Sequence, residues 1–566
     1  MTNRLLLAVL TLLLLLNWHG SMAQSVYAPL NTDYNYLIDR NEIQSGQLNL
    51  LHTSFKPYLR SEIAHTIEQA NTDSTIKKSK QDDFNNSYLT TDNWEHLKTE
   101  VNSKKALLKF CYTKPNALLS YQDKDFEIQT NVVLHSQIGG ETNAAGYRYT
   151  NTKGVEIRGM INKKVGFYSF LTDNQINYNT YVNNFITNTG AVPGEGFHKP
   201  FKVTARDFIT ARGYITFNAT KNINLQFGHD KNFIGNGMRS LILSDFGNSY
   251  LFLKIQTSVW KLKYTNLFAQ MNAMGPNDFG PNNLYPRKYF ALHHLSLNVN
   301  KHFNIGLFES IVFGRSDSSN QGSFDINYMN PIIFYRWAEQ QNGSPDNANL
   351  GLDFKLNMLK HFSLYGQVFI DEFIFANVIA RNGSWTNKQG LQIGLKTINI
   401  FNIPTLDVQV ETNIVRPYTY AHFSNYTNYT NYGQALAHPY GANFNEYIGI
   451  LRYQPLHKLQ LMGKLIYANI GLDSNNTNLG AGNFGGNIFK PYVLVSDKHS
   501  LHNVIGQGNT THLIYLSATA SYMLKHNLFI DVEMIARSYS NTFVNNKALI
   551  FNIGLRMNLA RRVQEF

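Results

Sequence analysis

The sequence has one cysteine and, beyond its first residues, no long apolar segment. Cys111 is the single cysteine among 566 residues, so intrachain disulfide bonds cannot hold the fold together. No later stretch approaches the ~20 apolar residues that a transmembrane helix needs. Charged residues make up 16% of the chain, and the net charge of +12 includes no long Lys/Arg block of the kind that binds nucleic acid. We therefore expect no nucleic-acid partner, and either a water-soluble chain or a membrane β-barrel.

The first 23 residues have the pattern of a secretory signal peptide. Arg4 supplies the positive charge, and residues 5–16 form a nearly unbroken apolar run. Ser21 and Ala23 place small residues before an expected cleavage site at Gln24. The apolar run is too short to span a bilayer as a helix, so a retained anchor is the less favoured alternative. The pattern predicts export from the cytoplasm.

Residues 24–125 predict a small helical domain on the periplasmic side of the membrane. Leu59, Ile63 and Ile67 recur at a spacing of four, which is typical of one face of a helix. Residues 74–86 are polar and suit an exposed connection between helices.

From residue 126 to residue 566 the hydrophobic period changes to two. Leu406, Val408 and Val410, for example, alternate with Asp407 and Gln409. Roughly eighteen such segments follow one another, and bacterial barrels have even strand numbers. Each has an apolar face for lipid and a polar face for a wet lumen. A soluble sandwich or propeller is the alternative, although no internal repeat is evident.

The connections between these segments alternate between short and long, as in outer-membrane barrels with short periplasmic turns and long outer loops. The long ones are expected near 173–209, 231–248, 315–346, 373–388, 416–445 and 471–511. The 33 Tyr and 37 Phe suit the aromatic girdles of such a barrel. Phe566 is an aromatic terminus typical of this class, although Arg561, Arg562 and Glu565 interrupt the pattern before it. The predicted fold is an all-β transmembrane barrel of about eighteen antiparallel strands with a small helical N-terminal domain.

Charged residues gather in stretches that we expect to form a polar network in the lumen or its loops. The candidates are His229, Asp230, Arg239, Asp245, Arg336, Glu339, Asp346, Asp353, Asp371 and Glu372. His229 and Asp230 offer an acid and a base, but hydrogen-bonded loop residues are the favoured interpretation. Asp371 and Glu372 fit a glycosidase pair poorly, because adjacent strand residues point to opposite faces. We therefore predict no catalytic residues.

A tyrosine-rich stretch in the long connection at 416–445 predicts sugar contact, because aromatic rings stack on sugars and amides bind hydroxyl groups. The candidates are Tyr418, Tyr420, His422, Tyr426, Tyr429, Tyr432, His438 and Asn443. An aromatic girdle with a polar loop is an equally favoured interpretation. His422 and His438 lack the spacing of a metal site, so we predict neither metal nor cofactor.

Four long segments resemble the Wzi family of capsule assembly proteins, in the form found in Bacteroidetes that includes RemB-like gliding-motility proteins. They are FGHDKNFIGNGMRSLILSDF at 227–246, NPIIFYRWAEQQNGSPDNANLGLDF at 330–354, LYGQVFIDEF at 364–373 and RPYTYAHFSNYTNYTNYGQALAHPYGANF at 416–444. The resemblance extends from about residue 30 to the end of the chain. It implies an eighteen-stranded outer-membrane barrel whose periplasmic mouth is closed by N-terminal helices.

The resemblance also implies a function, which is non-enzymatic binding of capsular or other exopolysaccharide at the cell surface. It names no catalytic residues. Two alternatives stay open: a gliding or adhesion component with surface or motility proteins as partners, and a porin-like solute channel. In each case we expect contact with outer-membrane lipid.

Overall fold

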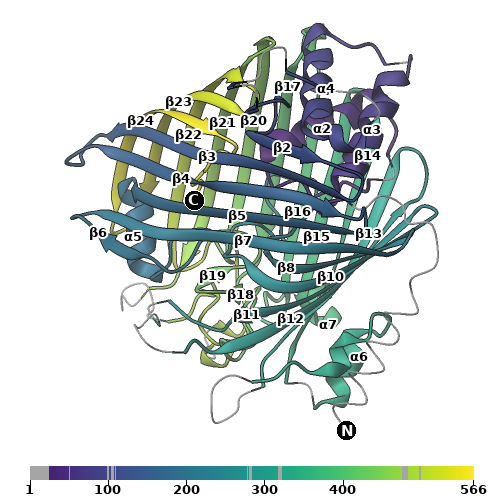
Figure 1. The fold of residues 1–566 in the computed structure, drawn as a ribbon. Coiled ribbons are helices and arrows are strands. Elements are labelled where there is room, and N and C mark those ends of the chain that lie inside the picture. The colour runs from purple at the N-terminus through teal and green to yellow at the C-terminus, as the bar shows by residue number, and fades with distance from the viewer. Residues whose placement is uncertain are drawn as a thin grey trace.

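In the described part of the chain, eighteen antiparallel strands close into one barrel. The computed structural model describes residues 25–566 apart from 50, 75, 98–100, 104–106, 109, 277, 279–283, 316–321, 344, 475–481 and 496–498. The predicted signal peptide therefore lies outside the described residues, and the domain boundaries at 23/24 and 125/126 stay predictions. The predicted fold class and strand number are confirmed. Figure 1 shows how the strands form the wall of the barrel.

Each strand of the barrel pairs with the next along the chain, and β24 pairs with β3 to close it. The strands are β3 (Phe126–Glu141), β4 (Arg148–Ile161), β5 (Val165–Asn177), β7 (Ala205–Thr220), β8 (Ile223–Asp230), β10 (Tyr250–Val259), β11 (Leu262–Asn272), β12 (Arg287–Asn298), β13 (Phe303–Phe313), β14 (Asn347–Met358), β15 (Phe362–Glu372), β16 (Lys388–Thr397), β17 (Leu406–Val415), β20 (Phe444–Leu456), β21 (Leu459–Leu472), β22 (Asn509–Lys525), β23 (Leu528–Ser540) and β24 (Asn545–Met557). Two short strands, β2 (Leu119–Gln122) and β6 (Lys199–Phe201), pair with β3 and β7 at the rims.

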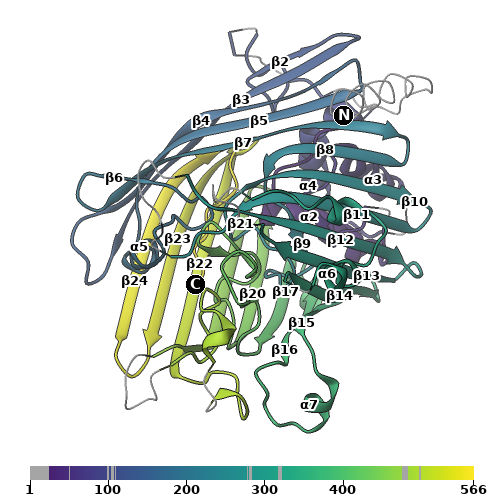
Figure 2. The same ribbon diagram turned by 90° about the horizontal axis from the view of Figure 1, so that it is seen from below.

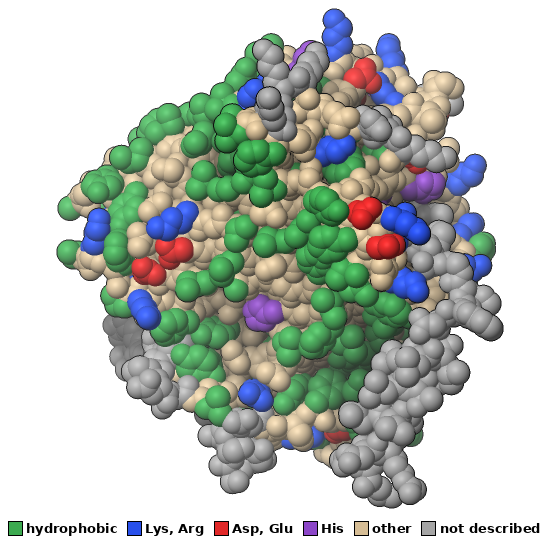
Figure 3. Space-filling model, in the orientation of Figure 1, with side chains coloured by type: hydrophobic (Ala, Val, Ile, Leu, Met, Phe, Trp, Pro, Cys, Tyr) green, Lys and Arg blue, Asp and Glu red, His purple; other side chains and the backbone are tan. Residues whose placement is uncertain are grey.

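The alternating sequence pattern becomes an alternation between the two faces of the wall. On β22, Ile514 and Leu516 are 46% and 51% exposed on the outer face, whereas Tyr515 and Ser517 are 1% and 5% exposed inside. Figure 3 shows apolar side chains spread in bands over the wall, with fewer charged side chains, gathered toward the edges. The outer face is therefore suited to lipid and the inner face to polar contacts.

The two ends of the barrel differ in their connections. At one end, which we call the short-turn end, Asn162, Lys163 and Asn527 adopt positive φ in tight turns. At the other, the long-loop end, the connections are 178–204, 231–249, 273–286, 314–346, 373–387, 416–443 and 473–508, with brief links at 142–147 and 541–544. The described parts of these connections contain the α-helices α5 (Thr180–Thr189), α6 (Tyr335–Gln341) and α7 (Phe375–Ile379).

The N-terminal helices lie at the short-turn end, opposite α5, α6 and α7 (Figure 1). They are α2 (Thr32–Ser45), α3 (Arg60–Thr72) and α4 (Lys80–Asp92), followed by the 3-10 turn η1 (Trp94–His96). Asn31 caps α2, and Ser79 and Asp82 form a capping box on α4. Ile38, Ile63 and Leu89 form a shared core between them. Among the described residues, no helix has the length and apolar character to cross a membrane.

The last residues do not extend the wall. β24 ends at Met557, and residues 558–566 turn into the lumen, where the C-terminus is seen in Figure 2. Arg561 pairs with Asp33 (Nη2 to Oδ1, 3.0 Å), and the Phe566 ring packs on Phe185 at 4.7 Å. Phe566 therefore lies inside the barrel and not at the end of a strand of the wall. The charged residues before it are the reason, since they find partners inside the barrel and not in lipid.

Candidate functional site

Buried ion pairs fasten α2 to the inside of the wall. Asp39 lies between Lys396 (Nζ to Oδ2, 2.6 Å) on β16 and Lys355 (Nζ to Oδ1, 3.5 Å) on β14. Arg40 bridges Asp82 on α4, at 2.9 Å, and Asp407 on β17. Burial alone would raise the pKa of Asp39, but the two lysines outweigh it and lower the pKa below its usual value. The helices are thus held as a plug by buried charges, each of which depends on its partner across the plug–wall contact.

Two long connections fold inward and fill the lumen above this plug. In the first, β9 (Phe233–Ile234) pairs with β1 (Phe55–Lys56) of the N-terminal region. In the second, β18 (Thr430–Asn431) and β19 (Gln434–Ala435) form a small hairpin. The Tyr420 hydroxyl donates to the carbonyl of Leu241 and the Tyr429 hydroxyl to that of Ile242, both at 2.7 Å. Together with inward residues of the wall they form a continuous apolar core inside the barrel.

This packing changes the role of the tyrosine-rich stretch. Seven of its eight candidate sugar-contact residues are buried: Tyr418, Tyr420, His422, Tyr429, Tyr432, His438 and Asn443. Tyr426 is the candidate that stays partly exposed. The structure thus places most of this stretch inside the barrel, because aromatic rings gain more by burial in the lumen than by exposure to water. Sugar contact by these residues stays a prediction.

The C-terminal residues border a cavity of about 250 Å³ in the lumen. Its basic lining residues are Arg212, Lys231, Arg239, Arg452, Lys464, Arg561 and Arg562, and its acidic ones are Asp33, Glu195, Asp245 and Glu565. Cations outnumber anions in the lining, which favours an anionic or hydroxyl-rich occupant over an apolar one.

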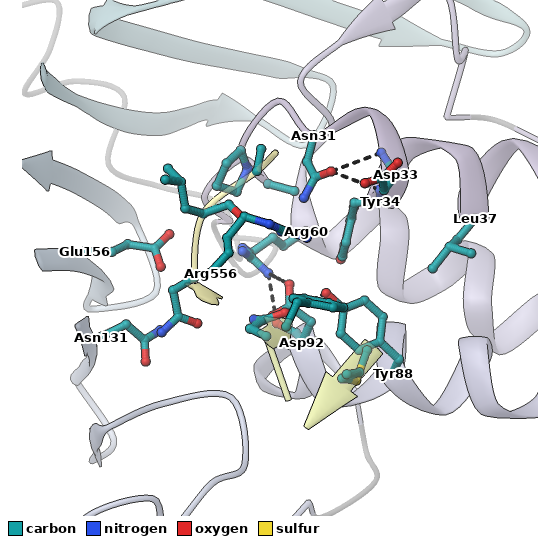
Figure 4. Close-up of a pocket in the computed structure, with 18 of the residues that line it drawn as sticks. Asn31, Asp33, Tyr34, Leu37, Arg60, Tyr88, Asp92, Asn131, Glu156 and Arg556 are labelled. Atoms are coloured by element: carbon teal, nitrogen blue, oxygen red, sulfur yellow. Dashed lines mark hydrogen bonds and ion pairs between the residues drawn. The ribbon is translucent and has the colours of Figure 1, made fainter. Parts of the chain in front are cut away.

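A smaller cavity of about 100 Å³ separates the plug from the wall (Figure 4). Asn131, Glu156 and Arg556 face it from the wall, opposite Tyr34 and Arg60 of the helices. Arg60 donates to Asp92 at 2.8 Å, marked by a dashed line in Figure 4. The lining mixes charged side chains with apolar ones such as Leu37, Met523 and Phe529.

Four members of the predicted polar network do lie inside the barrel in ion pairs or close hydrogen bonds. Asp353 accepts from His294 (Nε2 to Oδ2, 2.6 Å), and Arg239 pairs with Glu446 at 3.0 Å. Asp230 lies 3.9 Å from Arg212, and Asp371 accepts from the backbone N–H of Tyr420 at 2.7 Å. Asp245 lines the cavity of about 250 Å³ in the lumen.

Four other members lie elsewhere. His229 is exposed on the outer face of β8, because it neighbours the inward Asp230 on an alternating strand. Arg336 and Glu339 lie on α6, and Asp346 pairs with Arg315, all on a connection that packs against the outside of the wall. These four residues therefore lie outside the lumen, three of them on a long connection, and their role in a polar network stays a prediction.

Asp371 and Glu372 depart from simple strand alternation. The pairing of β15 with β16 shifts register between Ile370 and Glu372. Both carboxylates therefore lie near Lys388, with its Nζ at 3.9 Å from Asp371 and 3.0 Å from Glu372. The shared lysine gives the two carboxylates a structural partner.

An aromatic cluster at the long-loop end joins residues that the sequence does not connect. Tyr492 contacts Trp385 (ring centroids 5.2 Å apart) and His422 (5.3 Å), and His422 contacts Phe423 at 4.8 Å. The Lys388 ammonium lies 4.4 Å from the Tyr492 ring centroid. We call Trp385, His422, Phe423 and Tyr492 the rim cluster.

The rim cluster offers ring faces to the outside. Trp385, Tyr492 and Phe423 are partly exposed, whereas His422 is 8% exposed. Burial, with Lys388 nearby, lowers the pKa of His422 to about 3, so its ring is neutral at pH 7. Its members come from three different connections, and no local sequence signal groups them.

Comparison with known proteins yields matches among solved structures alone. No family model matches the sequence, and no curated protein matches it. One matching structure is Wzi, an outer-membrane protein involved in group 1 capsule assembly in Escherichia coli and described as a carbohydrate-binding β-barrel. It is 13% identical, with a TM-score of 0.57, and the match covers 95% of this chain and 100% of Wzi.

The chain shares its fold with Wzi. Pseudomonas aeruginosa OprD (8% identity, 76% and 94% coverage, TM-score 0.40) and OpdK with vanillate (8%, 76% and 98%, 0.44) also match. Because the Wzi match covers nearly the whole of this chain, it includes the N-terminal helices as well as the barrel. At this identity the likeness establishes the architecture.

Proposed function

We propose that this protein is a non-enzymatic outer-membrane barrel that binds capsular or other exopolysaccharide at the cell surface. The long-loop end then faces outward and the N-terminal helices lie on the periplasmic side. The observation that carries the proposal is the rim cluster, a set of partly exposed aromatic rings above a filled lumen. Such rings offer apolar faces to sugars, and the neighbouring Glu372, whose side chain is 42% exposed, offers a carboxylate to hydroxyl groups.

Two further features support this proposal. The fold is shared with Wzi, whose description is that of a carbohydrate-binding barrel in capsule assembly. The plug, the inward connections and the C-terminal residues occupy the lumen, which suits an anchoring protein more than a wide pore. We also propose kinship with the capsule assembly family. A gliding or adhesion role has no observation in its favour here and stays a prediction from resemblance.

We expect Trp385→Ala and Tyr492→Ala each to weaken binding of the native surface polysaccharide about tenfold, equal to about 1.4 kcal/mol. The reason is the loss of a stacking face for a sugar ring. Biolayer interferometry with the purified protein in detergent and a panel of capsular and exopolysaccharides measures the change. Tyr147→Ala is the matched control, since Tyr147 is 58% exposed at the same end but lies outside the cluster.

Equal binding by the wild type and both cluster variants would remove the rim cluster from the proposal. Loss of binding in Tyr426→Ala alone would then shift the contact to the partly exposed candidate of the tyrosine-rich stretch.

A solute channel is the second candidate, favoured by the charged cavities that follow one another inside the barrel. We expect the wild type to show little steady current in a planar bilayer at neutral pH, because the plug and the inward connections are tightly packed. An open porin reconstituted in parallel serves as the positive control. A large, steady conductance of the wild type would favour the channel over the anchor.

A further inference from the structure

The outer face of the wall carries a row of polar side chains at mid-height. Asn266, His293 and Glu309 are register partners on β11, β12 and β13. They point outward, because the neighbouring His294 points inward to Asp353 and strand residues alternate. A carboxylate and an imidazole directed at lipid are costly unless something covers them.

A segment of the long-loop end covers this row. We call it the outer strap, residues 322–343, which contains the 3-10 turn η2 (Ile326–Met329) and α6. The Tyr335 ring stacks on His293 with centroids 4.1 Å apart, and the backbone N–H of Arg336 donates to Glu309 Oε1 at 3.1 Å. α6 thereby lies against β13 and β14 (Figure 2).

Polar contacts hold the strap at its ends. Arg315 pairs with Asp325 at 2.8 Å and with Asp346 at 2.7 Å. Tyr328, which is fully buried, donates its hydroxyl to Asp346 at 2.7 Å and packs its ring on Phe313 at 4.7 Å. The strap is therefore a packed element of the outer wall and its placement is specific.

The far face of the strap is apolar and unpartnered within the described chain. Its large exposed apolar side chains are Ile326 (76%), Met329 (43%), Ile332 (83%), Phe334 (76%) and Trp337 (56%), with Asn327, Asn330 and Gln340 exposed beside them. They continue the apolar outer face of the wall, where Leu307 and Leu350 are 55% and 46% exposed in neighbouring rows. Arg336 is also exposed, so the strap combines Trp, Phe and Arg as interfacial segments of membrane proteins do.

We propose that the outer strap is embedded in the membrane, with its apolar face against lipid acyl chains, and that it seals the polar row of β11, β12 and β13 from the lipid. This inference rests on the membrane part of the proposed function, but it is independent of sugar binding. It assigns residues 330–343, the first part of the 330–354 segment, to lipid contact and not to the lumen.

The test uses tryptophan fluorescence of the full chain in phosphatidylcholine vesicles with brominated acyl chains. Trp18, Trp94, Trp260 and Trp385 are replaced by Phe, which leaves Trp337 as the single tryptophan. Because interfacial segments bury their apolar faces ~5–10 Å deep, we expect the bromine to lower Trp337 emission about twofold and aqueous iodide to have little effect. Phe334→Trp in a Trp337→Phe background is a second reporter, should the first variant fold poorly.

Two controls separate this inference from the proposed function. Leu391 lies on the outer face of β16 and is 48% exposed, so Leu391→Trp reports whether the barrel itself is in lipid. A variant that keeps Trp385 alone reports a water-facing site. Quenching of both Leu391→Trp and Trp337 by bromine supports the strap.

Quenching of Leu391→Trp by bromine, with Trp337 quenched by iodide, overturns the proposal that the strap is embedded in the membrane. The membrane location of the barrel is then still supported. Protection of Trp337 from both quenchers also overturns it, and indicates a protein partner on that face. Failure of bromine to quench Leu391→Trp overturns the strap and the proposed membrane location together.

Discussion

Replacing Tyr429 by Ala is expected to destabilise the folded barrel by about 3–5 kcal/mol, the cost of removing a large aromatic side chain from a packed core. Tyr429 is fully buried, its ring lies 5.4 Å from Phe369 and 5.8 Å from Phe290, and its hydroxyl donates to Ile242. Urea unfolding in detergent micelles, followed by heat-modifiable gel migration, measures the change.

Two controls separate packing from sugar recognition at this position. Tyr429→Phe removes only the hydroxyl and leaves the Ile242 carbonyl without its donor, at a cost of about 1–3 kcal/mol. Tyr426→Ala, at a partly exposed position of the same stretch, should change stability by less than about 0.5 kcal/mol. If Tyr429→Ala were as stable as the wild type, the inward packing of residues 416–443 would be wrong.

Replacing Asp39 by Asn is expected to loosen the N-terminal plug and to destabilise it by about 3 kcal/mol, because Lys396 then stays buried without an anion. Lys355 keeps Glu42 as a partner, so the loss falls mainly on Lys396. The measurement is the rate of trypsin cleavage within the plug of the purified protein. Glu68→Gln, at an exposed position of α3, is the control.

The buried pair also makes the plug sensitive to acid. The pKa of Asp39 is below its usual value in the folded protein. Its contribution to the stability of the plug is therefore fully present above the unfolded pKa of about 4, and it is lost as the pH falls below that value. Asp39→Asn should therefore lose less plug stability between about pH 5 and pH 2 than the wild type does.

A double variant, Asp39→Leu with Lys396→Met, should recover much of the stability that Asp39→Asn loses. A further decrease in stability would contradict the role of the Asp39–Lys396 ion pair.

The wall of the barrel could be predicted from the sequence, because the alternation of apolar and polar residues is a local pattern. Leu406, Val408 and Val410 alternate with polar neighbours, and each such segment becomes a strand of the wall. Alternation also places Asp230 and His229 on opposite faces once the strand is recognised. The fold and the strand count follow from a period of two repeated along the chain.

The candidate site could be predicted from the sequence only in part. Tyr426 and Tyr429 have the same local sequence context, but one is partly exposed and the other is fully buried. The rim cluster joins Trp385, Phe423 and Tyr492 from separate connections. No spacing along the chain predicts contacts between residues so widely separated in the sequence.

The sequence by itself determined the barrel, its alternating faces, its short and long connections and the helical character of the N-terminal region, because these depend on neighbours along the chain. Only the tertiary structure decided that residues 231–249 and 416–443 fold into the lumen, that the strap folds onto the outer wall, and that the C-terminal residues leave the wall. The physical reason is that a long connection has no repeating pattern to direct it. Its direction depends on which distant partner buries its rings and charges best, as Ile242 does for Tyr429 and His293 does for Tyr335.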